Sequence, residues 1–540
     1  MDKPVPDNYR LTKENSANIL VPISETSDNK AFINPIQEFN RDLSVAAIRV
    51  WSEIVRAEKS AKFKSKRKGK KNAEEDANWK FKFSILDALS ATGLRAIRYA
   101  KEIPNADSKI YANDFLPDAV EAIRRNAEYN NVADKVKPVE GDASALMYQH
   151  RSGSKFDVVD LDPYGTAAPF VDAAVQCLSS GAVMAGTNYP EKWYVECSCK
   201  ATDLMSLSYA NYGGTPIRAE YSHEGALRLI LNSLSQSAAR YGRYIEPLMS
   251  LSIDFYVRMW VRVHDGSGEV KKAFSKTGSV HVCSFCRQHA IQPFGRITVK
   301  TNEKGNTSSR FQAAQAINQS DKCSECGAQY HTNGPMWIDR IHNKDFTKRM
   351  LEHIDQNADK YGTAVRMKGM VSVADGELED SPFYFTTDSV ASAMRMTAPP
   401  MVTIASGLVN AGYQVSRSHA LAGSIKTNAP SRVIHDMFRK WMKTHPIKLE
   451  NIKEGSPTRV LAMKEAEVDA DLTHNQAVVD LLGSKEKLRR YQSNPANWGP
   501  LAKPNSGPQN TKNSSEEHAN DNATSDDVDI HKSKKAKIDM

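Results

Sequence analysis

The sequence lacks an apolar run long enough to cross a membrane. Residues 167–186 come nearest, but Pro169, Asp172 and Gln176 interrupt them, and a membrane helix needs about 20 predominantly apolar residues. We interpret this stretch as a buried helix followed by a strand, and we expect no membrane span. Residues 1–30 carry five acids and no apolar centre of the signal-peptide type, so neither secretion nor an acid-poor mitochondrial presequence is expected.

Cysteine is scarce and the charge imbalance is small. Seven cysteines in a chain without a secretory signal indicate reduced thiols or metal ligands rather than a disulfide framework. The net charge of +8, from 72 Lys and Arg against 64 Asp and Glu, favours a polyanionic partner only mildly. At 540 residues the chain is long enough for two or three globular units with flexible segments.

Two stretches lack the composition of a folded core. Residues 62–71 contain seven cations, and we expect a solvated basic loop over residues 58–79. The tail from about Asn505 to Met540 has no aromatic residue and ends in the basic run 532–537, which predicts disorder. Either basic cluster is compatible with a nuclear localisation signal, a nucleic-acid contact or simple solvation.

Strand and helix patterns alternate between residues 80 and 190. Apolar strand patterns occupy residues 81–86, 109–112, 136–139 and 156–161. Helical spacing covers residues 91–103 and 117–129. Strands that alternate with helices of 10 to 15 residues are typical of βαβ units and a parallel sheet. The sequence therefore predicts a Rossmann-like α/β fold.

The strand over residues 156–161 ends abruptly at Asp162-Pro163-Tyr164-Gly165. In open α/β sheets, ligands bind at this carboxyl end of the strands. A carboxylate and an aromatic ring on a stiff loop could hold a flat heterocycle that carries an exocyclic amine, because the ring can stack and the carboxylate can accept an N–H. A strand followed by an ordinary proline turn is the alternative.

Acids follow four of the predicted strands, at Asp87, Asp114, Asp142 and Asp162. Asp114 lies 21 residues after Gly93, the spacing at which a carboxylate binds a ribose hydroxyl. The turn over residues 87–93 lacks the full GxGxxG that holds a pyrophosphate. This disfavours NAD and favours a nucleoside cofactor without phosphate, for which S-adenosylmethionine fits. Acids that merely serve as turn residues at strand ends are the alternative.

Four of the cysteines form two CxxC pairs, Cys283 with Cys286 and Cys323 with Cys326. Such pairs suit a tetrahedral zinc ion bound by four thiolates, a structural site because no coordination position stays open. The 36-residue gap between the pairs requires a loop, and residues 296–311, which are rich in Lys and Arg, could touch RNA. Redox dithiols or buried free thiols are the alternatives.

Eight longer motifs occur in order between about residue 30 and residue 450. They are Phe32–Asp42, Asp87–Glu102, Asn113–Phe115, Asp160–Gly165, Ser252–Arg258, Gly334–Trp337, Ser416–His419 and Lys426–Pro430. Together they resemble the eukaryotic and archaeal tRNA (guanine-26-N2)-dimethyltransferases. The resemblance implies an enzyme that transfers two methyl groups from S-adenosylmethionine to the exocyclic N2 of guanine 26 in tRNA.

The same resemblance implies roles for individual residues. Asp162 would be the catalytic acid group. By their own chemistry, Pro163 would stiffen the same loop and Tyr164 could stack on the base. The cofactor would be contacted by Arg41, Arg95, Asp114, Asp142 and Ala143. The order of motifs over residues 185–212 departs from the family pattern, so no functional residue is carried over from that segment.

The expected architecture is a Rossmann-like class I S-adenosylmethionine-dependent methyltransferase domain with a zinc-binding insertion and a C-terminal α/β RNA-binding domain. The expected segments are a flexible N-terminus (1–30), the methyltransferase domain (31–265), the four-cysteine segment (266–335), a C-terminal tRNA-binding domain (336–455) and a linker with a disordered tail (456–540). We expect tRNA as the partner, a monomer, and a nuclear location that allows for a mitochondrial pool. Another base-amine methyltransferase, or a non-catalytic tRNA-binding protein on this fold, is the alternative.

Overall fold

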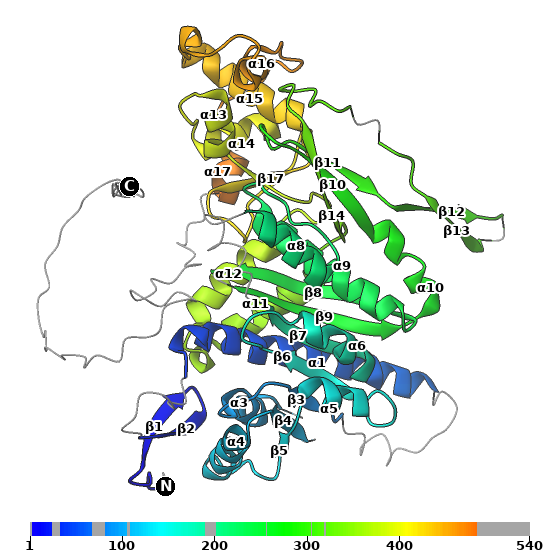
Figure 1. Ribbon diagram of the computed structural model, residues 1–540, viewed down its shortest axis with the longest axis vertical. Helices are drawn as coiled ribbons and strands as arrows, with labels where there is room; N and C mark the ends of the chain where they lie inside the picture. The colour runs from blue at the N-terminus through cyan, green and yellow to red at the C-terminus, as the bar shows by residue number, and fades with distance from the viewer. Residues whose placement is uncertain are drawn as a thin grey trace, which may run out of the picture. The chain divides into compact units, whose positions relative to one another are not determined.

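A seven-stranded sheet organises the N-terminal half of the chain in the computed structural model (Figure 1). The strands lie in the order β5–β4–β3–β6–β7–β9–β8. Their bounds are β3 (Ile85–Asp87), β4 (Ile110–Asp114), β5 (Val136–Glu140), β6 (Phe156–Leu161), β7 (Leu178–Asn188), β8 (Arg243–Ile253) and β9 (Tyr256–Asp265). Strands β3 to β7 are parallel, whereas β9 runs antiparallel to both of its neighbours. The predicted Rossmann-like α/β fold is confirmed, and the strand order reverses between β3 and β6, where such sheets bind ligands.

The structure describes residues 3–23, 33–66, 81–104, 109–188, 201–254, 256–303, 305–317 and 320–482. All of them lie in one unit, Met1–Asn494. None of the helices in these ranges is both long and apolar enough to span a membrane.

Helices cover both faces of the sheet, and neighbouring strand residues point to opposite faces. Ile85 and Val158 lie in a core with α1 (Glu38–Lys66), α3 (Leu94–Glu102), α4 (Pro117–Tyr129), α11 (Lys344–Gln356) and α12 (Ala364–Gly376). Leu86 and Val159 lie in a second core with α5 (Ala143–Gln149), α6 (Val171–Cys177) and α9 (Ser222–Ala239). Both faces of β3 and β6 are therefore covered, and their apolar side chains point into a core on either side of the sheet.

The expected flexible N-terminus contains an ordered hairpin, so that expectation is wrong for residues 9–22. Strand β1 (Tyr9–Glu14) pairs antiparallel with β2 (Ala17–Pro22). In β2, the alternate residues Ala17, Ile19 and Val21 pack into the core that contains α1 and α3, because one face of this strand is apolar. Residues 24–32 lie outside the described ranges.

Two other segments expected to be flexible are folded in part. Helix α1 continues to Lys66, so residues 58–66 are helical, and Glu58 forms an ion pair with Arg262 at 2.8 Å. Residues 67–79, the rest of the expected basic loop, lie outside the described ranges. In the expected linker, α16 (Pro457–Met463) and α17 (Gln476–Leu482) bury apolar side chains in the C-terminal core. The tail beyond residue 482 is likewise outside the described ranges.

A second, three-stranded sheet carries the first pair of cysteines. Its order is β11 (His289–Pro293), β10 (Thr277–Cys283), β14 (Tyr330–Trp337). Between β11 and β14 the chain forms a separate hairpin of β12 (Gly295–Thr301) and β13 (Thr307–Ala313), labelled in Figure 1. The predicted loop between the two cysteine pairs is therefore largely a β-hairpin.

The C-terminal part combines helices with a small sheet. The order of the sheet is β15 (Phe385–Thr386), β17 (Ser424–Thr427), β16 (Val415–Ser416). Helices α13 (Thr387–Met394), α14 (Met401–Asn410) and α15 (Ser431–Thr444) share one apolar core with α16, α17 and the four paired cysteines. The cysteine cluster is therefore packed against the C-terminal helices.

Candidate active site and metal centre

Asp162 lies directly after β6, at the carboxyl end of the parallel strands. Its Oδ2 forms an ion pair with Arg95 of α3. Its Oδ1 is buried and accepts no hydrogen bond from the described residues. A buried carboxylate oxygen without a donor costs free energy. The geometry therefore leaves an acceptor ready for an N–H group that a ligand would bring.

The residues after Asp162 form a stiff loop with an exposed ring. Pro163 is buried, whereas the side chain of Tyr164 is 95% exposed. Gly165 follows in a left-handed conformation with φ of 110°, which turns the chain sharply. An exposed aromatic ring beside an unpaired acceptor can stack on a flat ligand.

A buried ion network lies behind Asp162 and holds Arg95. Asp160 accepts two hydrogen bonds from Arg258, each of 2.8 Å, and lies 3.5 Å from Arg95. Burial raises the pKa of Asp160, but the charges of Arg258 and Arg95 outweigh it and hold the pKa below its ordinary value. The guanidinium of Arg95 therefore lies between two carboxylates. Neither Asp160 nor Arg258 was predicted from the sequence as a functional residue; for Asp160, an acid among the apolar residues of β6 was the available signal.

Arg41, a predicted cofactor contact, is held by the N-terminal hairpin. Its Nε donates to Glu14 at 2.6 Å, and its guanidinium also donates to the carbonyl of Asn34 at 3.0 Å. Arg98 donates to the same Glu14 at 2.9 Å. The hairpin thus fixes the direction of two arginines near the start of α1 and within α3, which the local sequence pattern did not indicate.

Asp114 organises the turn between β3 and α3. Its carboxylate accepts the N–H of Ala91 at 2.9 Å and the N–H of Leu116 at 3.1 Å. Gly93 in this turn has φ of 79°, and a Cβ there would lie 3.3 Å from Ile123. Each carboxylate oxygen keeps a further lone pair. Asp114 can therefore stabilise the turn and still accept a ribose hydroxyl.

Asp142 and Ala143 lie on the neighbouring loop, after β5. Asp142 caps α5 by accepting the N–H of Ala145 at 2.7 Å, and Ala143 is the first, buried residue of that helix. The side chain of Asn113 donates to the carbonyls of Ala88 and Gly141. This amide therefore ties together the loops that follow β3, β4 and β5.

Asp87, the fourth acid predicted at the end of a strand, is the last residue of β3 and is enclosed by the protein. It is 1% exposed and accepts a 2.6 Å hydrogen bond from Ser90. Burial, helped by the charge of Asp160 and opposed by Arg95, raises the pKa of Asp87 to about 7. β3 lies between β4 and β6, inside the sheet, and the buried side chain of Asp87 offers no exposed acceptor to a ligand.

The irregular segment 185–212 is described only at its two ends. Strand β7 runs through residue 188 and α8 (Ala201–Tyr212) begins at 201, while residues 189–200 lie outside the described ranges. Thr187 accepts a 2.6 Å hydrogen bond from Arg258. This end of the segment therefore supports the buried network beneath Asp162.

The residues at this edge fit S-adenosylmethionine by their chemistry. The turn after β3 offers no full phosphate cradle, Asp114 offers a carboxylate for a ribose, and Asp162 offers an unpaired acceptor next to the switch point. Nothing in this donor set requires a phosphate ligand.

The four paired cysteines form one cluster. The sulfur atoms of Cys283 and Cys326 lie 3.4 Å apart, and those of Cys286 and Cys323 lie 3.6 Å apart. A tetrahedral zinc ion with Zn–S bonds of 2.3 Å places its sulfurs about 3.8 Å apart. All four are buried and mutually within 4.8 Å. The cluster therefore fits a four-thiolate zinc site.

Glu325 links this cluster to the C-terminal helices. It lies between Cys323 and Cys326, and its carboxylate accepts from His435 at 3.2 Å, Arg439 at 3.1 Å and Lys464 at 2.5 Å. Burial raises the pKa of Glu325, but these three partners outweigh it and lower the pKa to about 2. Both carboxylate oxygens are satisfied.

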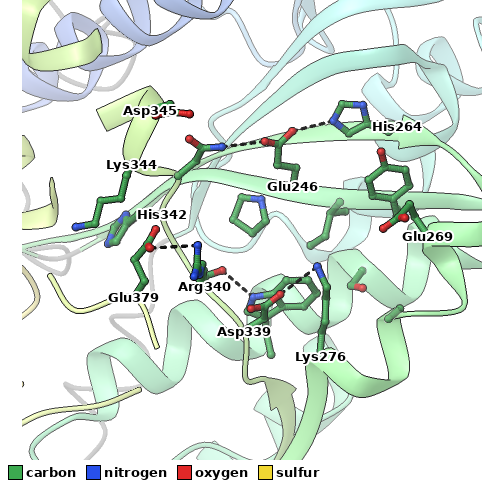
Figure 2. Close-up of a pocket in the computed structure, with 17 residues that line it drawn as sticks. Glu246, His264, Glu269, Lys276, Asp339, Arg340, His342, Lys344, Asp345 and Glu379 are labelled. Atoms are coloured by element: carbon green, nitrogen blue, oxygen red, sulfur yellow. Dashed lines mark hydrogen bonds and ion pairs between the residues drawn. The ribbon is translucent and has the colours of Figure 1, made fainter. Parts of the chain in front are cut away.

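A polar cavity of about 530 Å³ lies at the opposite edge of the sheet, where β8 begins and β9 ends. Figure 2 shows Glu246 linked to His264, and Lys276 linked to Asp339. Arg340 is paired with Glu379 at 3.1 Å. Since these charged groups already have partners, the cavity is a weaker candidate for chemistry than the edge with Asp162.

A family model described as N2,N2-dimethylguanosine tRNA methyltransferase matches residues 10–439. The chain belongs to this family. The match includes the N-terminal hairpin, the whole seven-stranded sheet and the cysteine cluster. The family resemblance seen in the sequence motifs is confirmed.

Two fungal relatives are similar to this chain over nearly their whole length. The tRNA (guanine(26)-N(2))-dimethyltransferase of Schizosaccharomyces pombe is 41% identical, over 90% of this chain and 91% of the relative. The Saccharomyces cerevisiae relative has the same name with the designation mitochondrial. It is 40% identical, over 92% of this chain and 93% of the relative. A solved structure of Trm1 from Pyrococcus horikoshii with S-adenosyl-L-methionine is 22% identical, with a TM-score of 0.58 over 79% of this chain and 99% of that chain. That likeness confirms the fold.

Proposed function

We propose that this chain is an S-adenosylmethionine-dependent tRNA (guanine-26-N2)-dimethyltransferase. The observation that carries the proposal is the buried Oδ1 of Asp162, which accepts no hydrogen bond from the described residues, beside the exposed ring of Tyr164. Membership of the family and the names of relatives at 35–41% identity support the same reaction and the same base.

The exocyclic amine of guanine is a poor nucleophile because its lone pair is delocalised into the ring. In the proposed mechanism, Oδ1 of Asp162 accepts one N–H of the amine and offsets the positive charge that develops on nitrogen. Arg95 holds Oδ2, which keeps Oδ1 directed at the base. Tyr164 stacks on the base, a contact worth roughly 1–3 kcal/mol. The carbonyl of Pro163, on the stiffened loop, accepts the second N–H.

The cofactor would supply a methyl group on a sulfonium, and the chain's residues would orient the two reactants. Asp114 would accept the ribose hydroxyls of the cofactor, and Asp142 and Ala143 would line its adenine end. Arg41 and Arg95 would lie near the carboxylate of the cofactor's methionine part. Each methyl transfer replaces one N–H of the amine, and the proton leaves through Asp162 to water. After the first transfer one N–H remains for Oδ1, so the same carboxylate can serve the second transfer.

The other assignments follow from the cysteine cluster and the C-terminal part. Cys283, Cys286, Cys323 and Cys326 would bind one structural zinc ion, and residues 336–455 would help to grip tRNA. We propose that the protein acts as a monomer.

The reaction is tested by incubating the zinc-loaded protein with S-adenosylmethionine and an unmodified tRNA transcript. Mass spectrometry of the nucleosides should find N2,N2-dimethylguanosine, and a transcript with adenine in place of guanine 26 should yield none. A methylated adenine, or methylguanosine from the altered transcript, would point to another base-amine methyltransferase. Cofactor and tRNA binding without any methylated product would favour a non-catalytic tRNA-binding protein.

The location we propose is the nucleus, on the basis of the basic runs over residues 62–71 and 532–537. Since a relative is designated mitochondrial, a mitochondrial pool is the competing outcome. Imaging of a fluorescent fusion with each run neutralised in turn tests the proposal. Nuclear signal that survives the loss of both runs would contradict it.

A further inference from the structure

The β12–β13 hairpin has two chemically different faces. Its register pairs Arg296 with Gln312, Thr298 with Arg310 and Lys300 with Ser308. Because side chains alternate along a strand, these six residues share one face. Residues 297, 299, 309 and 311 lie on the other face, which is more apolar. One face of the hairpin is therefore entirely cationic or hydrogen-bonding.

Three cations on the polar face are exposed and available. Arg296, Lys300 and Arg310 are exposed and take part in no ion pair among the described residues. Neither strand contains an acid; Glu303 lies in the turn between them. Arg296 and Lys300 are four residues apart, roughly 13 Å, with Arg310 across the ladder between them.

The cations of helix α15 provide a contrast. Arg432 is paired with Glu467 at 2.9 Å and Lys440 with Asp469 at 2.8 Å. Arg439 is buried against Glu325. A basic sequence on α15 therefore presents few uncompensated charges, whereas the hairpin presents three in a row.

The hairpin is anchored at its base. A Cβ on Gly295 would lie 2.1 Å from the ring of Phe274, so only glycine permits this close packing. The ring of Phe311 also lies against that of Phe274, with centroids 6.4 Å apart. Gln292 of β11 donates to the carbonyl of Gln315 at 3.1 Å. The hairpin is thus anchored to β11 and to the segment that contains Phe274.

We propose that the face formed by Arg296, Thr298, Lys300, Ser308, Arg310 and Gln312 binds the phosphate backbone of the RNA substrate. Phosphate contacts in nucleic-acid complexes come from Arg and Lys together with Ser, Thr and Gln side chains, the composition of this face. The row of charges follows one direction, as a backbone does. The inference rests on the proposed tRNA substrate and adds a contact surface made of residues other than those at the sheet edge with Asp162.

The test is the full-length, zinc-loaded triple variant Arg296→Gln/Lys300→Gln/Arg310→Gln, with tRNA affinity measured by fluorescence anisotropy at several salt concentrations. We expect the tRNA Kd to rise about ten-fold or more, and the slope of log Kd against log salt to fall by about 2 to 3. The matched control is the charge-conserving triple Arg296→Lys/Lys300→Arg/Arg310→Lys, which should bind tRNA as the wild type does. In turnover, the loss should appear in the KM for tRNA more than in kcat.

A triple variant with wild-type tRNA affinity and salt slope would overturn the proposal, as would an equal loss in the charge-conserving control. If the triple variant fails to retain zinc, the single variant Lys300→Gln is measured in its place. The slope of log Kd against log salt should then fall by about 1, and an unchanged slope would overturn the proposal. Failure of the proposed function would be seen separately. A wild-type protein that makes a different nucleoside refutes the guanine-26 assignment. Normal formation of dimethylguanosine, together with an unaffected triple variant, refutes only RNA binding by the hairpin face.

Discussion

A carboxylate paired with cations lies at the sheet edge and another lies beside the cysteine cluster, but the two differ in how many of their oxygens have a partner. Glu325 has both oxygens satisfied, by Lys464 on one and by His435 and Arg439 on the other. Asp162 has Arg95 on one oxygen and no donor from the described residues on the other. A fully satisfied carboxylate fastens elements together, whereas a half-satisfied one keeps an acceptor for a ligand. Glu325 therefore has a structural role, whereas Asp162 is placed to bind a ligand.

The largest effect is expected from loss of the metal at the cysteine cluster. Cys323→Ala should lower the zinc content and destabilise the C-terminal core, since structural zinc in small domains contributes about 10–16 kcal/mol of apparent folding free energy. Metal analysis and thermal unfolding measure this. Cys177→Ala, a buried cysteine of α6 outside the cluster, is the control. A Cys323→Ala protein with full zinc content and an unchanged melting temperature would show that the cluster is not a metal site.

A smaller effect is expected when Glu325 loses its charge. Glu325→Gln should lower the free energy of unfolding by about 3–5 kcal/mol, the usual cost of breaking a buried ion pair, while zinc stays bound. Denaturant unfolding of both proteins measures the difference.

The pH dependence of that difference has a definite sign. The folded pKa of Glu325, about 2, is below its ordinary value of 4.5, so its contribution is present above about pH 4.5 and is lost as the pH falls toward 2. The gap between wild type and Glu325→Gln should therefore stay constant from pH 7 to 5 and shrink below 4.5. A gap that widens in acid would contradict the assignment.

The smallest of these effects is expected at the cofactor side of the sheet edge. Asp114→Asn keeps the size of the side chain but weakens its acceptor, and should raise the Kd for S-adenosylmethionine about ten-fold, the equivalent of one hydrogen bond to a charged group. Isothermal titration calorimetry measures it. Asp118→Asn, an exposed acid in the first turn of α4, serves as the control. Equal Kd values for the two variants would remove Asp114 from the cofactor site.

Local patterns predicted much of the sheet because strand and helix periodicity is a short-range property. The helix expected over residues 117–129 has those bounds, and the strand expected before Asp162 ends at Leu161. The two CxxC pairs indicated a cluster whose sulfur atoms indeed come together. These features depend only on neighbouring residues or on a short motif.

Contacts between distant segments could not be predicted in this way. Glu14 reaches Arg41 and Arg98, and Glu325 reaches α15 across more than 100 residues. Asp87 and Asp114 end the neighbouring strands β3 and β4, yet only Asp87 is buried. Which oxygen of Asp162 is left without a donor depends on Arg95, and no spacing rule in the sequence shows that.

The most direct test of the central claim is a single-turnover measurement on Asp162→Asn, with S-adenosylmethionine affinity measured on the same preparation. If Oδ1 of Asp162 accepts the guanine amine, the rate of methyl transfer should fall by at least about 10²–10³-fold, with the cofactor Kd nearly unchanged. A wild-type rate of methyl transfer in Asp162→Asn would contradict the account.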